Sequence, residues 1–330
     1  MRSFIRPLAT LLLALPAWLL TTGFTLPETV DRDPSLPAVV LDGYRFHAEA
    51  FGAEDRPVVI VLHGGPGADY RYLLPLKALA DDGWRVVFYD QRGTGLSPRV
   101  PAGTITLDSF VADLDRFVEH FGRGRPVHLL GHSWGAMLAS AYAGAHPRKV
   151  AKMVLAEPAF LDASTADAMV SAGGPGPAVI WGFATAWLKK WFVRTGGDAY
   201  ARDDFFLMQI LPLTQGRAQM CEGRAPPLQA WRFGSPNFEA TIGRMRREPA
   251  FFAGLDFRRG AEAFEGGVLL LAGACNQVVG PAHQARHLRH FRHARLATVP
   301  DAGHFMFNDQ PQRSLDLVRD FLAEPAPGVR

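Results

Sequence analysis

Short apolar runs alternate with helix-like segments along most of this chain. Uninterrupted apolar runs are typical of strands buried on both faces, and periodic apolar positions at three-and-four spacing are typical of helices. Their alternation predicts a mostly parallel sheet covered by helices on both faces. The expected strands are a hairpin over 39–51 and single strands at 58–62, 84–89, 128–130, 151–156, 268–272 and 296–299, and the expected helices are 70–80, 107–121, 136–145, 282–291 and 312–322.

The alternation stops after the apolar run 151–156 and resumes only near residue 264. The intervening residues 159–263 are helix-like and rich in aromatic side chains. This break predicts an α/β core made of residues 38–158 and 264–324, with a helical cap at 159–263 inserted after the sixth strand.

The first 27 residues have the composition of an export segment. Arg2 and Arg6 precede an apolar run from Leu8 to Leu20 that contains no charge. A cleaved signal peptide and an uncleaved membrane anchor both fit this pattern. In either case the basic residues favour the cytoplasmic side, so the rest of the protein is expected in the periplasm or another extracytoplasmic space.

The composition excludes a disordered chain, a collagen and a disulfide-rich scaffold. The 330 residues carry 35 Lys+Arg against 32 Asp+Glu, a net charge of +3, and the basic residues are scattered. No nucleic-acid partner is therefore expected. Cys221 and Cys275 form no spacing pattern, so a disulfide in an oxidising compartment and two buried thiols both remain open.

A candidate nucleophile lies in the sequence Gly131-His132-Ser133-Trp134-Gly135. This G-x-S-x-G pattern joins an apolar strand to a helix of small residues, which is the context that a nucleophile elbow requires. The sharp turn would expose Ser133 at a helix N-terminus, where backbone N–H groups favour developing negative charge.

A second glycine-rich turn, His63-Gly64-Gly65-Pro66-Gly67, also follows a strand. Its glycines allow the backbone to approach a substrate carbonyl closely. The expected oxyanion hole consists of the N–H groups of Gly65 and Trp134.

His304 is the candidate general base. It follows the last predicted strand, after Ser133 in chain order, as the histidine of this motif does. The group His283, His287, His290 and His293 is interpreted as the solvated face of a helix. No metal site is expected, because no Cys or carboxylate partners fall at matching offsets, and no cofactor is implied.

Three motifs together resemble the proline iminopeptidase-like group of alpha/beta-hydrolases. They are HGGPG at 63–67, DQRGTGLS at 90–97 and GHSWG at 131–135, and the resemblance extends over about residues 38–324. It implies a serine nucleophile, a helical cap after the sixth strand and cleavage of an N-terminal proline.

The chain departs from that family at the expected triad acid. Members of the group usually carry an Asp in a G-x-x-D pattern after the seventh strand, and this chain has Gly273-Ala274-Cys275-Asn276 there. Glu157 stands directly after the sixth strand, where some haloalkane dehalogenases of the same fold place their acid. We therefore expect Glu157 to orient His304, with Asn276 as an alternative orienting group through its side-chain carbonyl. Asp301 is a third candidate.

The substrate pocket is less well marked by the sequence. We expect His63 and Gly64 of the glycine-rich turn and Trp181 and Trp187 of the cap to line it. The family's peptidases need cap carboxylates for the substrate's α-ammonium, whereas Asp203, Asp204, Glu222 and Glu239 of this cap are interpreted as surface charges.

The expected function is that of a serine hydrolase acting on a peptide, amide or ester, with a small molecule or short peptide as partner. A carboxylesterase or lipid hydrolase is the near alternative. The missing Asp also keeps open a non-catalytic ligand-binding protein on a hydrolase scaffold.

Overall fold

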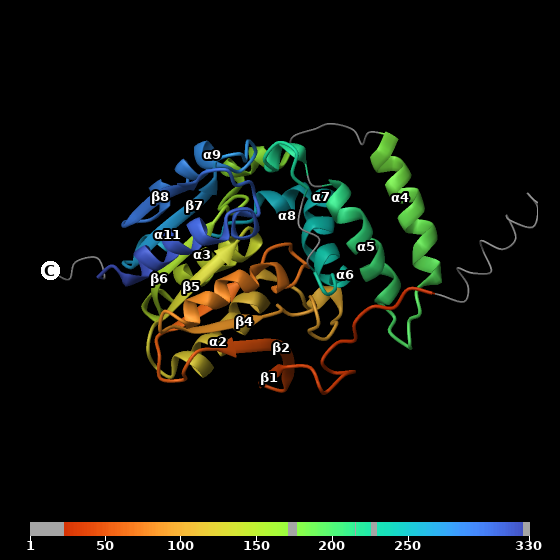
Figure 1. The fold of residues 1–330 in the computed structure, drawn as a ribbon, viewed down its shortest axis with the longest axis horizontal. Coiled ribbons are helices and arrows are strands. Elements are labelled where there is room, and N and C mark those ends of the chain that lie inside the picture. Colours follow the sequence, from red (N-terminus) through yellow and green to blue (C-terminus); the bar gives the residue numbers. More distant parts are fainter. Residues whose placement is uncertain (1–22, 171–176, 215, 226–229, 326–330) are drawn as a thin grey trace, which may run out of the picture.

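The centre of the molecule is an eight-stranded sheet with the order β1-β2-β4-β3-β5-β6-β7-β8 (Figure 1). β2 pairs antiparallel with both β1 and β4, and all later neighbours are parallel. The computed structural model describes residues 23–170, 177–214, 216–225 and 230–325. The predicted fold class, a mostly parallel sheet between helices with a helical cap, is confirmed.

The strands lie where apolar runs predicted them, and every residue of β3 and β7 is buried. These strands could be predicted from uninterrupted apolar sequence because helices cover both of their faces. The strands are β1 (Ala38–Leu41), β2 (Tyr44–Phe51), β3 (Val58–Leu62), β4 (Arg85–Tyr89), β5 (Val127–His132), β6 (Val150–Ala156), β7 (Gly267–Gly273) and β8 (Ala294–Val299).

The helices of the core pack on the two sides of this sheet. The segment expected as a helix over 70–80 is a 3-10 helix that contains Pro75, which has no N–H to donate to an α-helical hydrogen bond. Thr106 and Ser109 form a capping box at the start of α2. The core helices are η1 (Arg71–Ala80), η2 (Ala102–Thr104), α2 (Leu107–Gly122), α3 (Trp134–Ala145), η3 (Pro147–Lys149), α9 (Pro281–Ala285), η9 (Leu288–His290), α10 (Met306–Asp309) and α11 (Pro311–Ala323).

The described chain between β6 and β7 is largely helical and lies beside the sheet on one side of the molecule (Figure 1). Backbone hydrogen bonds fasten it to the core, for example from the N–H of Gly234 to the carbonyl of Gly67. Its helices are η4 (Ala163–Val170), α4 (Pro177–Lys189), η5 (Lys190–Phe192), α5 (Ala201–Thr214), η6 (Arg217–Gln219), α6 (Ser235–Phe238), the π-helix η7 (Glu239–Gly243), α7 (Arg244–Arg247), α8 (Pro249–Ala253) and η8 (Ala261–Ala263).

The predicted export segment falls mainly on residues 1–22, which lie outside the described part of the chain. Among the helices that the structure describes, none combines the length and the apolar character needed to span a bilayer.

The prediction that His283, His287, His290 and His293 form the solvated face of one helix is wrong. The segment 282–291 is broken into α9 and η9, and His283 and His287 are buried. Both ring nitrogens of His287 lack a hydrogen-bond partner among the described residues. Burial, with the neighbouring His283 and His290, lowers the pKa of His287 to about 3.

This buried imidazole should make the protein sensitive to acid. The unfolded chain binds a proton at His287 below about pH 6.5, whereas the folded protein resists it until about pH 3. The free energy of unfolding should therefore fall as the pH drops through this window. At pH 4 the loss attributable to this residue is on the order of 3 kcal/mol.

Urea unfolding at pH 7 and pH 4 tests this expectation. His287→Met should reduce the difference between the two pH values, and replacement of the exposed His293 by Met is the matched control. An unchanged pH difference in His287→Met would show that the buried imidazole is not the acid-sensitive group.

Candidate active site

Ser133 occupies a sharp turn between β5 and α3. Its backbone has φ 54° and ψ −118°, a conformation that non-glycine residues rarely adopt. The flanking Gly131 and Gly135 permit the turn, because a Cβ on Gly135 would collide with the carbonyl of Leu62 and one on Gly131 with Gly135 itself. The serine N–H is held by the carbonyl of Ala156 at 2.8 Å. This is the strained strand-to-helix geometry of a nucleophile elbow.

Glu157 and His304 are brought together although 147 residues separate them. Glu157 follows β6 and His304 lies between β8 and α10. The His304 Nδ1 atom is 2.7 Å from Glu157 Oε2. The glutamate backbone has φ 46° and its N–H donates to the carbonyl of Leu271. A fully buried carboxylate therefore orients the imidazole.

Burial acts on the two groups of this pair in opposite directions. It lowers the pKa of His304 to about 4, so the imidazole is in its basic form at neutral pH. It raises the pKa of Glu157, while hydrogen bonds from the Gly273 N–H and the Asn276 amide act against that rise. The neutral imidazole is the form that a general base needs.

Asn276 supports the carboxylate instead of the imidazole. Its Nδ2 donates to Glu157 Oε2 at 2.7 Å, and its Oδ1 accepts from the N–H groups of Val278 and Val279. The alternative in which the Asn276 carbonyl orients His304 is therefore wrong. In the usual arrangement of the family the carboxylate that orients the histidine follows the seventh strand. Here the carboxylate of Glu157 follows the sixth strand, and Asn276, after the seventh strand, donates a hydrogen bond to it. Asp301 lies exposed on the loop after β8, and within the described part of the chain its carboxylate forms no hydrogen bond or ion pair with His304, whose Nδ1 faces Glu157.

Tyr72 and His132 form a link that the sequence did not reveal. His132 Nε2 lies 2.7 Å from the carbonyl of His304 and must donate to it, so His132 Nδ1 accepts from the Tyr72 hydroxyl at 2.8 Å. The same hydroxyl accepts from the Gly64 N–H at 2.7 Å. One buried chain of hydrogen bonds thus fixes the glycine-rich turn, the nucleophile turn and the loop of His304 relative to one another. The sequence feature that could have indicated this link is His132, the residue directly before the serine in the G-x-S-x-G motif.

A cavity of about 470 Å³ opens at Ser133 and His304. Gly64, Gly65 and Trp134 also line this cavity. The Gly64 N–H already donates to the Tyr72 hydroxyl, so the N–H groups of Gly65 and Trp134 remain the candidate oxyanion donors, as predicted. Most of its walls are apolar, and among the described residues that line it none is Asp or Glu. Apolar side chains that contribute are Met137, Phe160, Phe183, Met208, Ile210, Leu211, Phe233, Phe238, Ile242 and Met245.

Of the four residues predicted to line the substrate pocket, three do not line the cavity. Gly64 lines the cavity, but His63 is fully buried behind it, where its Nε2 accepts from the N–H of Gln91. Trp181 and Trp187 are 72% and 55% exposed and do not line the cavity. Phe183, another aromatic residue of α4, lines the cavity in their place.

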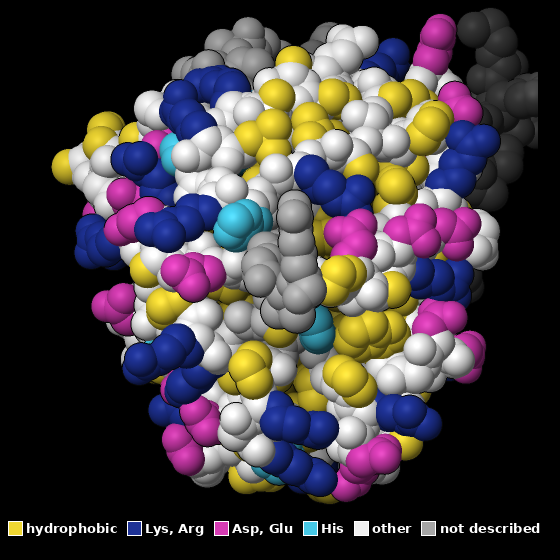
Figure 2. Space-filling model, turned by 90° about the vertical axis from the view of Figure 1, so that its left-hand side faces the viewer, with side chains coloured by type: hydrophobic (Ala, Val, Ile, Leu, Met, Phe, Trp, Pro, Cys, Tyr) yellow, Lys and Arg dark blue, Asp and Glu magenta, His cyan; other side chains and the backbone are white. Residues whose placement is uncertain are grey.

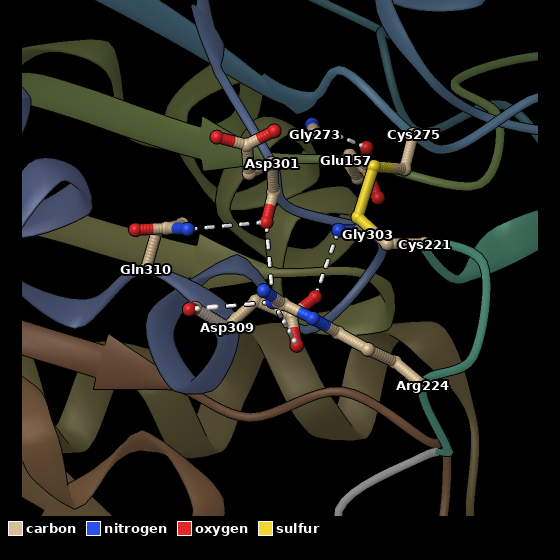
Figure 3. The surroundings of a disulfide bond; sticks show 9 residues. All are labelled: Glu157, Cys221, Arg224, Gly273, Cys275, Asp301, Gly303, Asp309 and Gln310. Atoms are coloured by element: carbon tan, nitrogen blue, oxygen red, sulfur yellow. Dashed lines mark hydrogen bonds and ion pairs between the residues drawn. A yellow bond between two sulfur atoms is a disulfide. The ribbon is translucent and has the colours of Figure 1, made fainter.

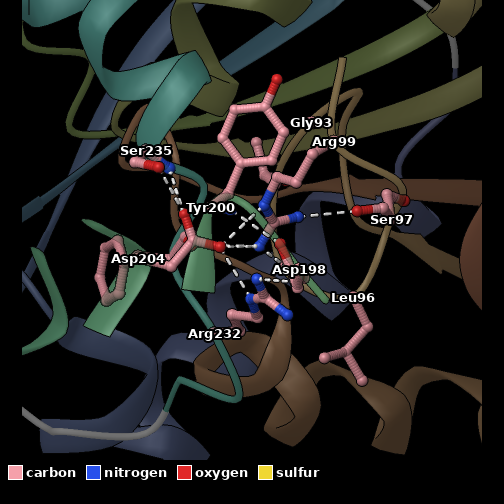
Figure 4. Close-up of polar contacts among 12 residues, drawn as sticks. Gly93, Leu96, Ser97, Arg99, Asp198, Tyr200, Asp204, Arg232 and Ser235 are labelled. Atoms are coloured by element: carbon pink, nitrogen blue, oxygen red, sulfur yellow. Dashed lines mark hydrogen bonds and ion pairs between the residues drawn. The ribbon is translucent and has the colours of Figure 1, made fainter. Parts of the chain in front are cut away.

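The prediction that Asp204 is a surface charge is also wrong, because its side chain is fully buried. Its carboxylate accepts from Arg232 at 2.7 Å, from Arg99 at 2.9 Å and from the Ser235 hydroxyl at 2.6 Å (Figure 4). Arg232 also pairs with Asp198 at 2.5 Å. This network joins the cap to the loop after β4, and both carboxylate oxygens of Asp204 are engaged within the protein.

Cys221 and Cys275 form a disulfide, which answers the question that their spacing left open. The bond joins the cap segment after η6 to the loop after β7, close to Glu157 (Figure 3). The same cap segment holds the base, because the His304 N–H donates to the carbonyl of Gln219 at 2.8 Å. The disulfide thus fastens the cap beside the Glu157–His304 pair.

Removing this disulfide should cost stability. The two cysteines are 54 residues apart, and closing a loop of that length in the unfolded chain corresponds to about 4 kcal/mol in the chain-entropy model. We expect Cys221→Ser/Cys275→Ser to lose about 3 to 4 kcal/mol of unfolding free energy in urea titrations. Wild type treated with a reductant should give the same midpoint as the double variant. Equal midpoints for oxidised wild type and the double variant would contradict the expectation.

Comparison with known proteins identifies the fold family. The family model described as "alpha/beta hydrolase fold" matches residues 57–311. The chain belongs to the alpha/beta-hydrolase fold family. This hydrolase is 45% identical over 106 residues to a proline iminopeptidase of Heyndrickxia coagulans, covering 30% of this chain and 34% of the relative. It is 30% identical over 179 residues to a cis-3-alkyl-4-alkyloxetan-2-one decarboxylase of Xanthomonas campestris, covering 51% of this chain and 53% of the relative.

Solved structures extend the likeness over nearly the whole fold. A proline iminopeptidase of Mycobacterium smegmatis aligns with 87% of this hydrolase and 97% of its own chain, with a TM-score of 0.59 and 21% identity. An esterase of Exiguobacterium antarcticum aligns with 88% and 100%, with a TM-score of 0.60 and 20% identity. At these identities the likeness concerns the fold, and the curated relatives above match over only about a third to a half of their own length.

Proposed function

We propose that this protein is a serine hydrolase that cleaves esters or amides of apolar acyl groups through an acyl-enzyme. The observation that carries the proposal is that His304, paired with the buried Glu157, lines one largely apolar cavity together with Ser133. A nucleophile, a base and a group that orients the base are the three parts that such a mechanism requires.

In the proposed reaction His304 Nε2 takes the proton of the Ser133 hydroxyl while the serine oxygen bonds to the substrate's carbonyl carbon. The N–H groups of Gly65 and Trp134 stabilise the oxyanion. His304 then gives the proton to the leaving alcohol or amine, and the carbonyl reforms as the acyl-enzyme. A water molecule, deprotonated by His304, then attacks the carbonyl carbon of this ester. As the bond to the serine oxygen breaks, His304 returns the proton to that oxygen, which releases the acid and regenerates Ser133. Glu157 stabilises the imidazolium in both halves.

The walls of the cavity support the substrate class. Apolar side chains favour an alkyl or aryl acyl group. A free α-ammonium would need a carboxylate, and the described lining offers none, since Asp204 is already engaged by Arg99 and Arg232. An acyl group without a positive charge therefore fits the cavity better than an N-terminal proline.

Cleavage of an N-terminal proline is the second candidate. It is favoured by the identity of 45% over 106 residues to a protein named proline iminopeptidase. The two candidates share Ser133, His304 and Glu157 and differ only in what the cavity accepts.

Two substrates and one probe separate the candidates. We expect kcat/KM for octanoyl 2-naphthylamide to exceed that for proline 2-naphthylamide, which has the same leaving group, by at least about 100-fold, the penalty of leaving a substrate ammonium unpaired in an apolar site. A faster reaction with the proline amide would establish the aminopeptidase. A folded protein that hydrolyses neither and does not react with a fluorophosphonate would instead be a ligand-binding protein on this scaffold.

We also propose that the protein works outside the cytoplasm. The support is the apolar run 8–20 behind Arg2 and Arg6 together with the Cys221–Cys275 disulfide, because such bonds persist in oxidising compartments. Fractionation of cells that express the full chain tests this, and recovery in the cytosol with both thiols reduced would refute it.

A further inference from the structure

The exposed apolar side chains of this protein are concentrated on one helix of the cap. Among the described residues, seven large apolar side chains are 39% to 72% exposed, and five of these lie on α4 and the adjoining η5. They are Ile180, Trp181, Trp187, Leu188 and Trp191. On the face beside β8 and α11, by contrast, acidic and basic side chains are interspersed (Figure 2). Apolar exposure on this scale over one helix marks an interaction site.

These five residues form a continuous stripe. Counted from Ile180, the exposed positions fall at i, i+1, i+7, i+8 and i+11, with the exposed Ala184 at i+4, which is one face of a helix. The opposite face packs on α5, where Ala186 is buried with Leu207 and Ile210. α4 is therefore apolar on both sides, whereas a helix that faces water carries polar residues outward.

α4 is the outermost element of the cap and has α5 beside it on its inner side (Figure 1). It also separates the cavity from the outside, because Phe183 on its inner face lines the cavity. Whatever covers the outer face lies one helix away from the candidate active site.

Basic groups flank the stripe at its C-terminal end. Lys189 is exposed, Lys190 lies 5.3 Å from the centre of the Trp191 ring, and the Arg202 guanidinium lies 5.2 Å from the same ring. Tryptophan beside lysine and arginine is the combination found where proteins contact the interface of a bilayer.

The described chain begins at the same end of α4. The Phe24 N–H donates to the carbonyl of Phe192 at 3.1 Å, and the Arg194 N–H donates to the carbonyl of Phe24 at 2.8 Å. The uncharged run 8–20 is thus joined to the folded protein beside η5. A membrane that held this run would lie next to the tryptophans.

We propose that the exposed face of α4 and η5 lies on the surface of an anionic phospholipid bilayer. The tryptophan and aliphatic side chains enter the interface between headgroups and acyl chains, and Lys189 and Arg202 face lipid phosphates. This orientation points the cap, and not the edge of the sheet at β8, toward the membrane.

Tryptophan quenching in the full chain tests this proposal. Vesicles of phosphatidylcholine and phosphatidylglycerol with brominated acyl chains quench tryptophans that reach the interface. We expect the quenched share of the emission to fall at least twofold in Trp181→Phe/Trp187→Phe/Trp191→Phe, which keeps the face apolar and removes its reporters. Trp84→Phe/Trp231→Phe, which removes two tryptophans outside this face, is the matched control and should leave the quenched share unreduced.

Two other occupants of this face give different results. If residues 8–20 alone enter the bilayer, Trp18 is quenched and the triple variant loses no quenching relative to wild type, which overturns the proposal. If a second copy covers the face, the full chain dimerises without vesicles, Trp187→Glu abolishes the dimer, and brominated lipid leaves the three tryptophans unquenched. Neither measurement depends on hydrolysis, so the result stands apart from the proposed function.

Discussion

Replacement of Ser133 by alanine is expected to abolish reaction with a fluorophosphonate and to lower kcat/KM for p-nitrophenyl octanoate by at least about 10⁴-fold. Without the hydroxyl no acyl-enzyme forms, and the oxyanion donors alone retain only a small part of the rate enhancement. The change removes one atom from a half-buried side chain, so the fold should persist. Gel fluorescence of the labelled protein and initial rates of hydrolysis are the measurements.

Ser140→Ala is the matched control for this variant. Ser140 lies on α3, the helix that begins after Ser133, and it is fully buried without lining the cavity. It should retain labelling and rate within a few-fold of wild type. Loss of labelling in both variants would indicate damage to α3, and retention in Ser133→Ala would exclude this serine as the nucleophile.

The parts of the fold and site that the sequence predicted are those determined by local pattern. β3 and β7 were visible because every residue in them is buried, and Ser133 was visible because strand, glycines and helix all lie within a few positions of it. Glu157 was found from its place at the end of β6. The parallel sheet then brings strand ends together, which is why this residue meets His304 at 2.7 Å.

The parts that were missed depend on partners far away in the sequence. Asp204 has the sequence context of a solvated charge, and only folding brings it to Arg99, 105 residues distant. Tyr72 sits in a helix whose pattern indicates core, and its hydroxyl meets His132 60 residues away.

The tryptophans of α4 were misassigned for a related reason. A helix that is apolar on both faces has no periodicity to show which face points inward. Phe183 and Trp187 are therefore equivalent candidates for the pocket in the sequence, although only Phe183 lines the cavity.

Replacement of Glu157 by glutamine should have the next largest effect, a loss of about 10³ to 10⁴ in kcat/KM, by the precedent of serine proteases that lose their buried acid. The three neighbours of this carboxylate all donate to it: the Gly273 N–H to Oε1, and Asn276 Nδ2 and His304 Nδ1 to Oε2. An amide NH₂ at either oxygen position must face a donor. His304 can relieve the conflict only by moving its proton to Nε2, which is the atom that has to accept the proton of Ser133.

Asn276→Ala discriminates this account from one in which the amide orients the base. Asn276 donates to the carboxylate and uses its own carbonyl for Val278 and Val279, so its loss removes one of three hydrogen bonds to Glu157 and leaves the imidazole in place. We expect about a 10-fold loss in kcat/KM, about 1.4 kcal/mol, which is close to the lower limit of the net contribution of a hydrogen bond to a charged group. If Asn276→Ala were as inactive as Glu157→Gln while both remained folded by circular dichroism, the acid would not be the group that orients His304. The two variants together therefore locate the negative charge of the site at the end of the sixth strand.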